Sequence, residues 1–168
     1  MALHLESLAE TRRAGLALGG SLPPRALVLL RGPMGAGKTT LAKAICEGLG
    51  IAPAQVISPT YTLVNIYPLP PPGAAVYHVD LFRIEDPDAL LELDRNDWVS
   101  PDGVTLIEWP EVALALLAGD ACLGLSLSVT GDDTRRLEAA GEDSVYGAAL
   151  RALDGAAARL GGAGGRAP

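Results

Sequence analysis

Cysteine and lysine are scarce in this sequence, and each shortage narrows what the protein can be. The chain has two cysteines, Cys46 and Cys122, and neither belongs to a C-x-x-C pair. We expect both to be reduced, buried and apolar, which favours a cytoplasmic location. Lysine occurs only as Lys38 and Lys43, so the N-K-x-D element with which GTPases read guanine is absent. The sequence therefore argues against an ordinary GTP switch.

Long apolar runs are also missing. No run reaches the length of a membrane span, and the N-terminus lacks the charged and apolar pattern of a signal peptide. We therefore expect no leader and no membrane partner. A length of 168 residues and a hydrophobic content of 49% suit one domain with a real core, which we place at residues 1–160. Residues 161–168 are predicted to form a flexible tail.

Positive charge is the third shortage, because the chain carries a formal net charge of -7 at pH 7. This balance argues against a protein that binds nucleic acid on its own. The acids concentrate in one segment that contains only two bases, Arg83 and Arg95. A run of this kind is usually a solvated surface, although this one also contains two acids with a candidate role. The acids of the segment are Asp80, Glu85, Asp86, Asp88, Glu92, Asp94, Asp97, Asp102, Glu108 and Glu111.

A glycine-rich stretch at residues 31–40 carries the strongest signal. It matches the pattern G-x-x-x-x-G-K-[ST], with Gly32, Gly37, Lys38 and Thr39 at the fixed positions. Glycine accepts positive φ and keeps side chains away from phosphate oxygens that backbone N–H groups surround. Lys38 places a positive charge on the β- and γ-phosphates, and the Thr39 hydroxyl is available to Mg²⁺. The pattern predicts a P-loop that binds a nucleoside triphosphate with magnesium.

The segments on either side suit such a loop. Residues 26–30 form a continuous apolar run of strand length, as a buried parallel strand requires. Residues 40–50 predict a helix that is closed by glycines and has an apolar face with Leu41 and Ile45. A helix that follows the loop directly offers its unpaired N-terminal amides and its dipole to an anion. Strand, loop and helix together argue against a chance glycine-rich turn.

Two acids follow predicted strands. Asp80 lies near the end of the strand expected at residues 74–82, and Glu108 ends the one expected at residues 104–108. Ligands of α/β sheets bind at the carboxyl ends of the strands, where the loop also lies. We therefore expect Glu108 to act as a Walker-B acid towards Thr39 and the metal, with Asp80 beside it, since Mg²⁺ prefers oxygen ligands. The alternative is a pair of solvated acids just beyond the strand ends.

The remaining pattern predicts an α/β fold of the P-loop NTPase type, with a mixed, mainly parallel central sheet flanked by helices. An antiparallel C-terminal hairpin is expected from residues 122–130 and 134–140, with Arg135 and Arg136 exposed. Trp98 is expected in a loop. Further helices are predicted at residues 8–18, 87–93, 111–117 and 143–160, a strand up to residue 67, and a proline-rich hairpin tip at residues 68–73.

Four more residues have two interpretations each. Thr60, in a loop ahead of a strand, either contacts the γ-phosphate or is an ordinary turn threonine. Trp109, beside the second acid, either senses the bound nucleotide or packs in the core. His78 lies on the same strand face as Asp80, and by itself it is more typical of a packed core imidazole. Arg83 either offsets phosphate or acid charge or is a surface arginine.

Four motifs, in this order, resemble the TsaE family, the small P-loop ATPases needed to make threonylcarbamoyladenosine in bacterial tRNA. Many families share the first motif, whereas the other three are specific. The motifs are GPMGAGKTT (32–40), SPTYTLV (58–64), YHVDLFR (77–83) and LIEWPE (106–111).

The resemblance implies ATP and Mg²⁺ as cofactors and assigns residues to them. It also implies work with two partner proteins, TsaB and TsaD, through which tRNA is reached only indirectly. The resemblance gives Gly35, Ala36, Gly37, Lys38, Thr39 and Thr40 as the expected nucleotide contacts. Trp109 and Thr60 are added because of their positions in the sequence, beside Glu108 and in a loop ahead of a strand. The expected metal ligands are Thr39, Glu108 and Asp80, and the expected catalytic residues are Asp80, Glu108 and Lys38.

Three functions are compatible with these motifs. The leading one is an ATPase whose hydrolysis serves a tRNA-modifying complex. A small-molecule P-loop kinase usually needs an arginine-rich lid and an acceptor pocket, and the sequence after Trp109 supplies neither clearly. A nucleotide-gated binding module with incidental hydrolysis shares every motif. No residue is an obvious general base for the attacking water, so we expect slow turnover until a partner completes the site.

Overall fold

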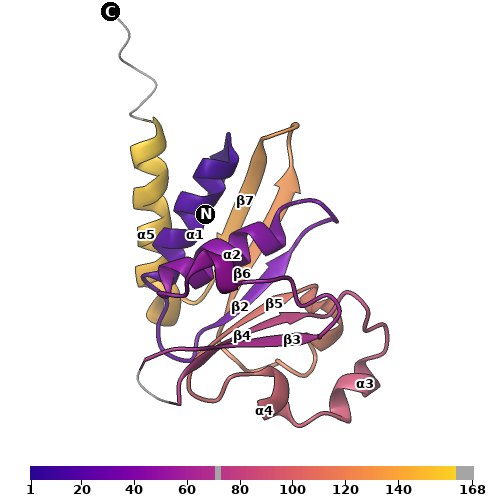
Figure 1. Cartoon of the computed structure of the whole chain (residues 1–168). Coiled ribbons are helices and arrows are strands. Elements are labelled where there is room, and N and C mark those ends of the chain that lie inside the picture. The colour runs from indigo at the N-terminus through magenta and orange to yellow at the C-terminus, as the bar shows by residue number, and fades with distance from the viewer. Residues whose placement is uncertain (71–72, 162–168) are drawn as a thin grey trace, which may run out of the picture.

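The structure is a computed structural model, and it describes residues 1–70 and 73–161 of the chain. Seven strands form one sheet in the order β1-β7-β6-β2-β5-β4-β3 (Figure 1). The sheet is parallel in its middle, where β6, β2, β5 and β4 lie side by side, and antiparallel at both edges. The predicted mixed sheet and C-terminal hairpin are confirmed. The strands are β1 (Ala2–Leu5), β2 (Leu27–Arg31), β3 (Val64–Pro68), β4 (Ala75–Asp80), β5 (Val104–Glu108), β6 (Cys122–Val129) and β7 (Arg135–Ala140).

Helices cover the two faces of the sheet unequally. The long helices α1, α2 and α5 pack on one face, and short helical turns cover the other (Figure 1). None of the helices in the described part of the chain has the length and apolarity needed to cross a membrane. The helices are α1 (Leu8–Gly19), α2 (Lys38–Gly48), α3 (Pro87–Leu91), α4 (Arg95–Trp98) and α5 (Asp143–Gly161), and the 3-10 turns are η1 (Pro53–Gln55) and η2 (Pro110–Ala113).

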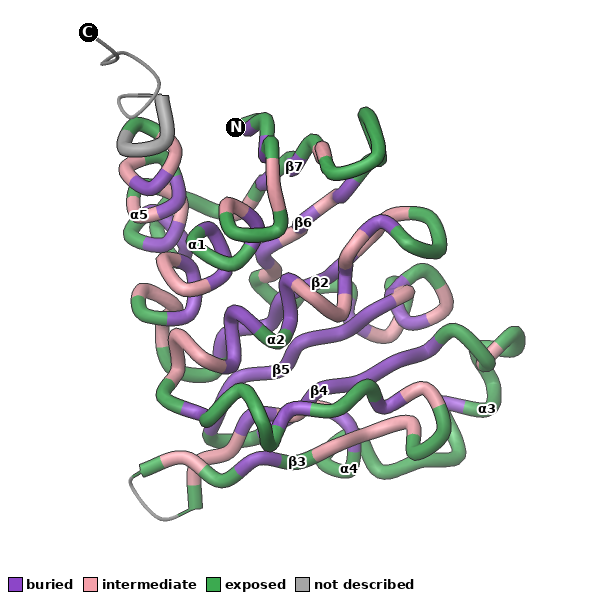
Figure 2. Tube along the Cα trace, turned by 45° about the horizontal axis from the view of Figure 1, so that its top comes forward, coloured by how far each residue is buried: buried purple, intermediate pink, exposed green. Residues whose placement is uncertain are grey.

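The central strands are buried on both faces because each lies between two apolar layers. In β2, Val28 and Leu30 belong to the core under the long helices, and Leu27 and Leu29 belong to the core on the opposite face. This division follows from the two-residue period of a strand. Figure 2 shows the same burial along β4 and β5. A continuous apolar run was therefore the correct sign of a buried parallel strand.

Several sequence-based expectations need correction. The strand β1 was not predicted, because its four residues are too few for a clear pattern. Trp98 ends the helix α4 and is buried, not in a loop. The predicted helix at residues 111–117 is the turn η2 followed by further turns, since packing of Ala113 and Leu117 into the core overrides helix propensity. Cys122 is only half-buried. Residues 71–72 of the predicted hairpin tip and 162–168 of the predicted tail lie outside the described residues.

Candidate functional site

The glycine-rich loop, which we define as residues 32–37, joins β2 to α2. Gly32 has a φ of 135°, and a Cβ at this position would lie 2.2 Å from the carbonyl oxygen of Leu127, so only glycine fits against β6. Gly37 caps α2 with a φ of 102°, in the left-handed region that other residues rarely adopt. The loop therefore begins pressed against the sheet and ends at the N-terminus of a helix, whose first amides have no partner within the helix.

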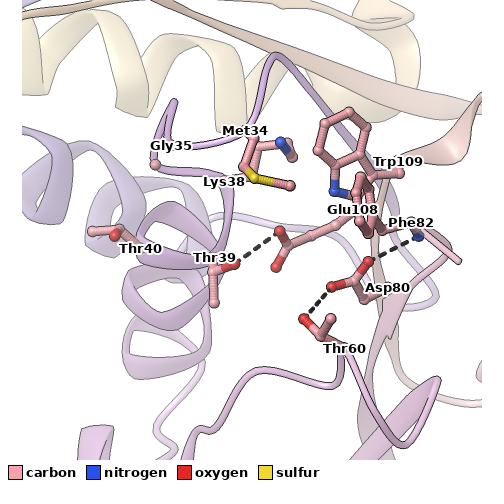
Figure 3. Close-up of a pocket in the computed structure, with 11 residues that line it drawn as sticks. Met34, Gly35, Lys38, Thr39, Thr40, Thr60, Asp80, Phe82, Glu108 and Trp109 are labelled. Carbon is pink, nitrogen blue, oxygen red and sulfur yellow. Dashed lines mark hydrogen bonds between the residues drawn. The ribbon is translucent and has the colours of Figure 1, made fainter.

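A cavity of about 360 Å³ lies beside this loop at the carboxyl ends of β2, β4 and β5 (Figure 3). Every residue predicted for the site lines it except Ala36, which is buried in the core behind the loop. Met34 and Phe82 also line it and were not predicted, because neither belongs to a pattern that carries chemistry. The full lining is Met34, Gly35, Gly37, Lys38, Thr39, Thr40, Thr60, Asp80, Phe82, Glu108 and Trp109.

The two strand-end acids lie next to each other because β4 and β5 pair with Asp80 opposite Glu108. Glu108 accepts a hydrogen bond from the Thr39 hydroxyl at 2.9 Å. Asp80 accepts one from the Thr60 hydroxyl at 2.7 Å and one from the backbone N–H of Phe82 at 3.0 Å (Figure 3). The side chains are not solvated, since Asp80 is 6% exposed and Glu108 2%. Thr39, Asp80 and Glu108 therefore meet at one place, as the sequence predicted.

His78 contacts the second of these acids. Its Nε2 lies 2.8 Å from Oε1 of Glu108, and the imidazole is fully buried. The two atoms are therefore within hydrogen-bond distance in a buried position. Nδ1 is buried and has no hydrogen-bond partner among the described residues. The imidazole is buried, as the sequence favoured, yet it also holds one oxygen of Glu108 while Thr39 holds the other.

The Lys38 side chain folds back to the start of the glycine-rich loop. Its ammonium donates to the carbonyls of Gly32 at 2.7 Å and Pro33 at 2.9 Å, and it lies 3.6 Å from the ring centroid of Trp109. Phe82 packs on the same indole, with ring centroids 5.0 Å apart. Burial lowers the pKa of Lys38 below its ordinary value, and the charges of Glu108, Asp80 and Glu111 oppose this shift. Lys38 is the one cation among the residues that line the cavity.

The two arginines that the sequence singled out lie elsewhere. Arg83 is exposed, and its guanidinium lies 4.5 Å from the ring of Tyr61, outside the cavity lining. This position fits a surface arginine. Arg135 is not fully exposed as predicted, because its side chain turns back to the glycine-rich loop. No pattern in the sequence signals this contact, which joins residues almost a hundred positions apart.

The donors around the cavity suit an anion and a hard cation together. Backbone amides at the start of α2 and the Lys38 ammonium are the groups that bind phosphate oxygens in proteins. The Thr39 hydroxyl and the carboxylates of Asp80 and Glu108 are the oxygen ligands that Mg²⁺ takes. No group of three or more His, Cys, Asp or Glu side chains that could hold a metal occurs in the described residues.

Comparison with known proteins identifies the family. The family model of the threonylcarbamoyl adenosine biosynthesis protein TsaE matches residues 5–137. The chain belongs to the TsaE family. The matched region contains the glycine-rich loop, both strand-end acids and Arg135, so the site described above lies within the part shared with TsaE proteins.

Individual relatives agree with this assignment. The tRNA threonylcarbamoyladenosine biosynthesis protein TsaE of Haemophilus influenzae is 38% identical over 112 residues, which cover 67% of this chain and 68% of that protein. The protein of the same name from Treponema pallidum is 31% identical over 134 residues, covering 80% of this chain and 96% of the relative. The crystal structure of Bacillus subtilis YdiB has a TM-score of 0.72 at 24% identity, covering 92% and 93% of the two chains. That likeness shows the fold.

Proposed function

We propose that this chain is a Mg²⁺-dependent ATPase that serves the threonylcarbamoyladenosine modification of tRNA in the cytoplasm, together with the partner proteins TsaB and TsaD. The observation that carries the proposal is the hydrogen bond of 2.9 Å from Thr39, at the start of α2, to Glu108, at the end of β5. It joins a loop suited to phosphate to an acid suited to a metal. Membership of the TsaE family supports the pathway.

In this proposal the loop and the helix it opens bind the phosphates. The N–H groups at the start of α2 would bind phosphate oxygens, and Lys38, which donates to the carbonyls of Gly32 and Pro33 in the structure, would neutralise the phosphate charge. Thr39, Glu108 and Asp80 would hold Mg²⁺, which neutralises charge that builds up on the phosphates during transfer. Thr40 and Trp109 complete the wall of the site.

Hydrolysis also needs a positioned water. Asp80 is buried and already accepts a hydrogen bond from the Thr60 hydroxyl at 2.7 Å, so these two side chains form a polar pair opposite the loop. We assign them to orient the water near the γ-phosphate. Phosphoryl transfer depends more on positioning and charge neutralisation than on a strong base. With one lining cation, the site is expected to turn over slowly until a partner adds to it.

Contact with tRNA is proposed to be indirect. The net charge is -7, and the acids of the segment between β4 and β5 are largely exposed. Binding to nucleic acid that does not depend on base sequence requires positive groups that neutralise the phosphates. A surface of this sign repels tRNA, and it suits docking to a protein instead. A cytoplasmic site of action agrees with the two free cysteines, Cys46 and Cys122.

The test is ATP hydrolysis by the purified chain, measured alone and with TsaB and TsaD. We expect slow phosphate release that rises with the partners and requires Mg²⁺. Asp80→Ala and Glu108→Ala should impair hydrolysis more than nucleotide binding, while the exposed acid Glu92→Ala serves as the control. A phosphorylated small-molecule product would indicate a kinase. Tight ATP binding with no partner-dependent hydrolysis would indicate a nucleotide-gated binding module.

A further inference from the structure

Arg135 lies at the start of β7, and its guanidinium donates hydrogen bonds to main-chain carbonyls. Its Nε donates to the carbonyl of Ala36 at 3.0 Å, and its Nη2 lies 3.5 Å from the carbonyl of Gly35. Its Nη1 donates to the carbonyls of Gly131 at 3.0 Å, Asp132 at 3.1 Å and Thr134 at 2.8 Å. One guanidinium thus joins the glycine-rich loop to the turn between β6 and β7.

We propose that Arg135 is a positioning residue that sets the phosphate-binding conformation of the glycine-rich loop. This inference rests on the proposed function, because it concerns how the same loop binds phosphate. The guanidinium contacts the loop at Ala36, which is buried and, like Arg135, lines a neighbouring cavity of about 210 Å³ instead of the one described above. Arg135 therefore acts through the loop backbone, not by touching the phosphates.

The peptide bond between Ala36 and Gly37 explains how the contact acts. In a trans peptide the C=O and the following N–H lie in one plane and point in opposite directions. Holding the Ala36 carbonyl towards Arg135 therefore turns the Gly37 N–H to the side away from the guanidinium. The preceding amide, that of Ala36, already donates to the Pro33 carbonyl at 3.2 Å. The Gly37 amide is thus the loop amide that Arg135 orients.

A fixed orientation matters here because the loop is flexible by composition. Gly35 and Gly37 have φ angles of 77° and 102°, and a Cβ at either position would meet nothing within 4 Å. Neighbouring side chains therefore do not restrain these two residues. Glycine has many accessible conformations, and holding one of them costs conformational entropy. Hydrogen bonds from a charged donor supply a restraint that packing does not.

Two cations bind four carbonyls of the glycine-rich loop. Lys38 binds those of Gly32 and Pro33, and Arg135 binds those of Gly35 and Ala36. In the proposed function Lys38 turns to the phosphates and releases its two carbonyls. Arg135 lies outside the cavity lining and keeps its own. It therefore holds the loop at the step when Lys38 no longer does.

The experiment measures binding of inorganic tripolyphosphate, ADP and ATP to the full chain by calorimetry. Arg135→Ala should weaken all three by about tenfold to a hundredfold, as expected when charge-assisted hydrogen bonds are lost. Arg135→Lys should recover part of the loss, because one ammonium reaches fewer carbonyls than a guanidinium. Arg136→Ala is the matched control. It removes the same positive charge, but the exposed side chain of Arg136 pairs with Glu138 and not with the loop. It should bind like the wild type.

The kinetics separate positioning from general stability. In Arg135→Ala the KM for ATP should rise while kcat at saturation stays within about threefold, because an oriented amide mainly affects binding. A melting temperature and a circular dichroism spectrum establish folding, and Arg135→Lys and Arg135→Gln provide graded losses of donors if the alanine variant does not fold.

Two results of the binding measurements would contradict the role of Arg135, and a third would contradict the proposed function. Tripolyphosphate binding unchanged in the Arg135 variants would overturn the inference. A loss confined to ATP and ADP, with tripolyphosphate unaffected, would also overturn it, since Arg135 would then contact the nucleoside. If the wild type itself binds none of the three ligands, the proposed function fails, which is a separate result.

Discussion

His78 and Glu108 form a buried pair across two adjacent parallel strands. The Nε2 of His78 lies 2.8 Å from Oε1 of Glu108, and neither side chain is more than 3% exposed. The contact is diagonal, because the strand register places His78 opposite Leu106 and Asp80 opposite Glu108. With Thr39 on Oε2, the chain itself holds both oxygens of this carboxylate. If Glu108 holds Mg²⁺ as proposed, His78 is the outer partner that would orient it.

The first prediction follows from this pair. In His78→Leu, one oxygen of Glu108 loses its hydrogen-bond partner, and we expect ATP turnover to fall about 10- to 100-fold. Nucleotide affinity measured in EDTA should stay unchanged, because the phosphate-binding groups are intact. His78→Gln keeps an N–H at a similar reach and should recover most of the activity. If the leucine variant is fully active, His78 only fills the core.

The second prediction concerns Lys38. Lys38→Ala should abolish productive nucleotide binding, since the cavity lining offers no other cation. Equilibrium titration with ATP measures this. Lys43→Ala is the control, because Lys43 is the other lysine of the chain and is exposed on α2. Near-normal ATP turnover in Lys38→Ala would refute the P-loop assignment.

The third prediction uses Trp109 as a reporter. Its ring lies 3.6 Å from the ammonium of Lys38, so a nucleotide that draws Lys38 away should change the indole emission. The measurement needs the Trp98→Phe background, in which the buried Trp98 no longer contributes. Trp109→Phe, which leaves only Trp98, should show no response. Emission that is insensitive to ATP and ADP in the Trp98→Phe protein would return Trp109 to a packing role.

The fourth prediction concerns pH and stability. Burial raises the pKa of Cys46 from 9.0 to about 12, so the thiol stays neutral in the folded chain while it ionises in the unfolded chain. Below pH 9 this difference adds nothing to the pH dependence. Between pH 9 and the pKa of Cys46 in the folded chain, ionisation of the unfolded chain should lower the free energy of unfolding by about 1.4 kcal/mol per pH unit. Urea unfolding at pH 8 to 11 measures it, and Cys46→Ala should lack this contribution. Parallel curves for the two proteins would contradict it.

The fifth prediction is that the isolated chain binds tRNA negligibly at physiological salt. The net charge is -7, and the bases outside the site lie in separate elements, such as Arg12 in α1 and Arg151 in α5. Fluorescence anisotropy with labelled tRNA tests this. Micromolar affinity that weakens steeply with salt would reveal a basic surface formed by distant elements.

The loop, its strand and its helix could be predicted because their causes are local. Glycines at fixed spacing, an apolar run before them and a helical pattern after them each act within a few residues. The positions of Asp80 and Glu108 followed from one general rule, that parallel strands of an α/β sheet end at the same edge. A short list of residues was therefore enough to predict that Thr39, Asp80 and Glu108 meet.

The tertiary structure alone decided the contacts that hold these groups in place. The sequence determined that His78 shares a strand face with Asp80, but the register of β4 on β5 decided that it reaches Glu108. Arg135 looked like an exposed strand residue, and only the return of the hairpin to β2 brings it to Ala36. The physical reason is that such hydrogen bonds join distant parts of the chain, and their partners depend on strand order and register, which local propensity does not encode.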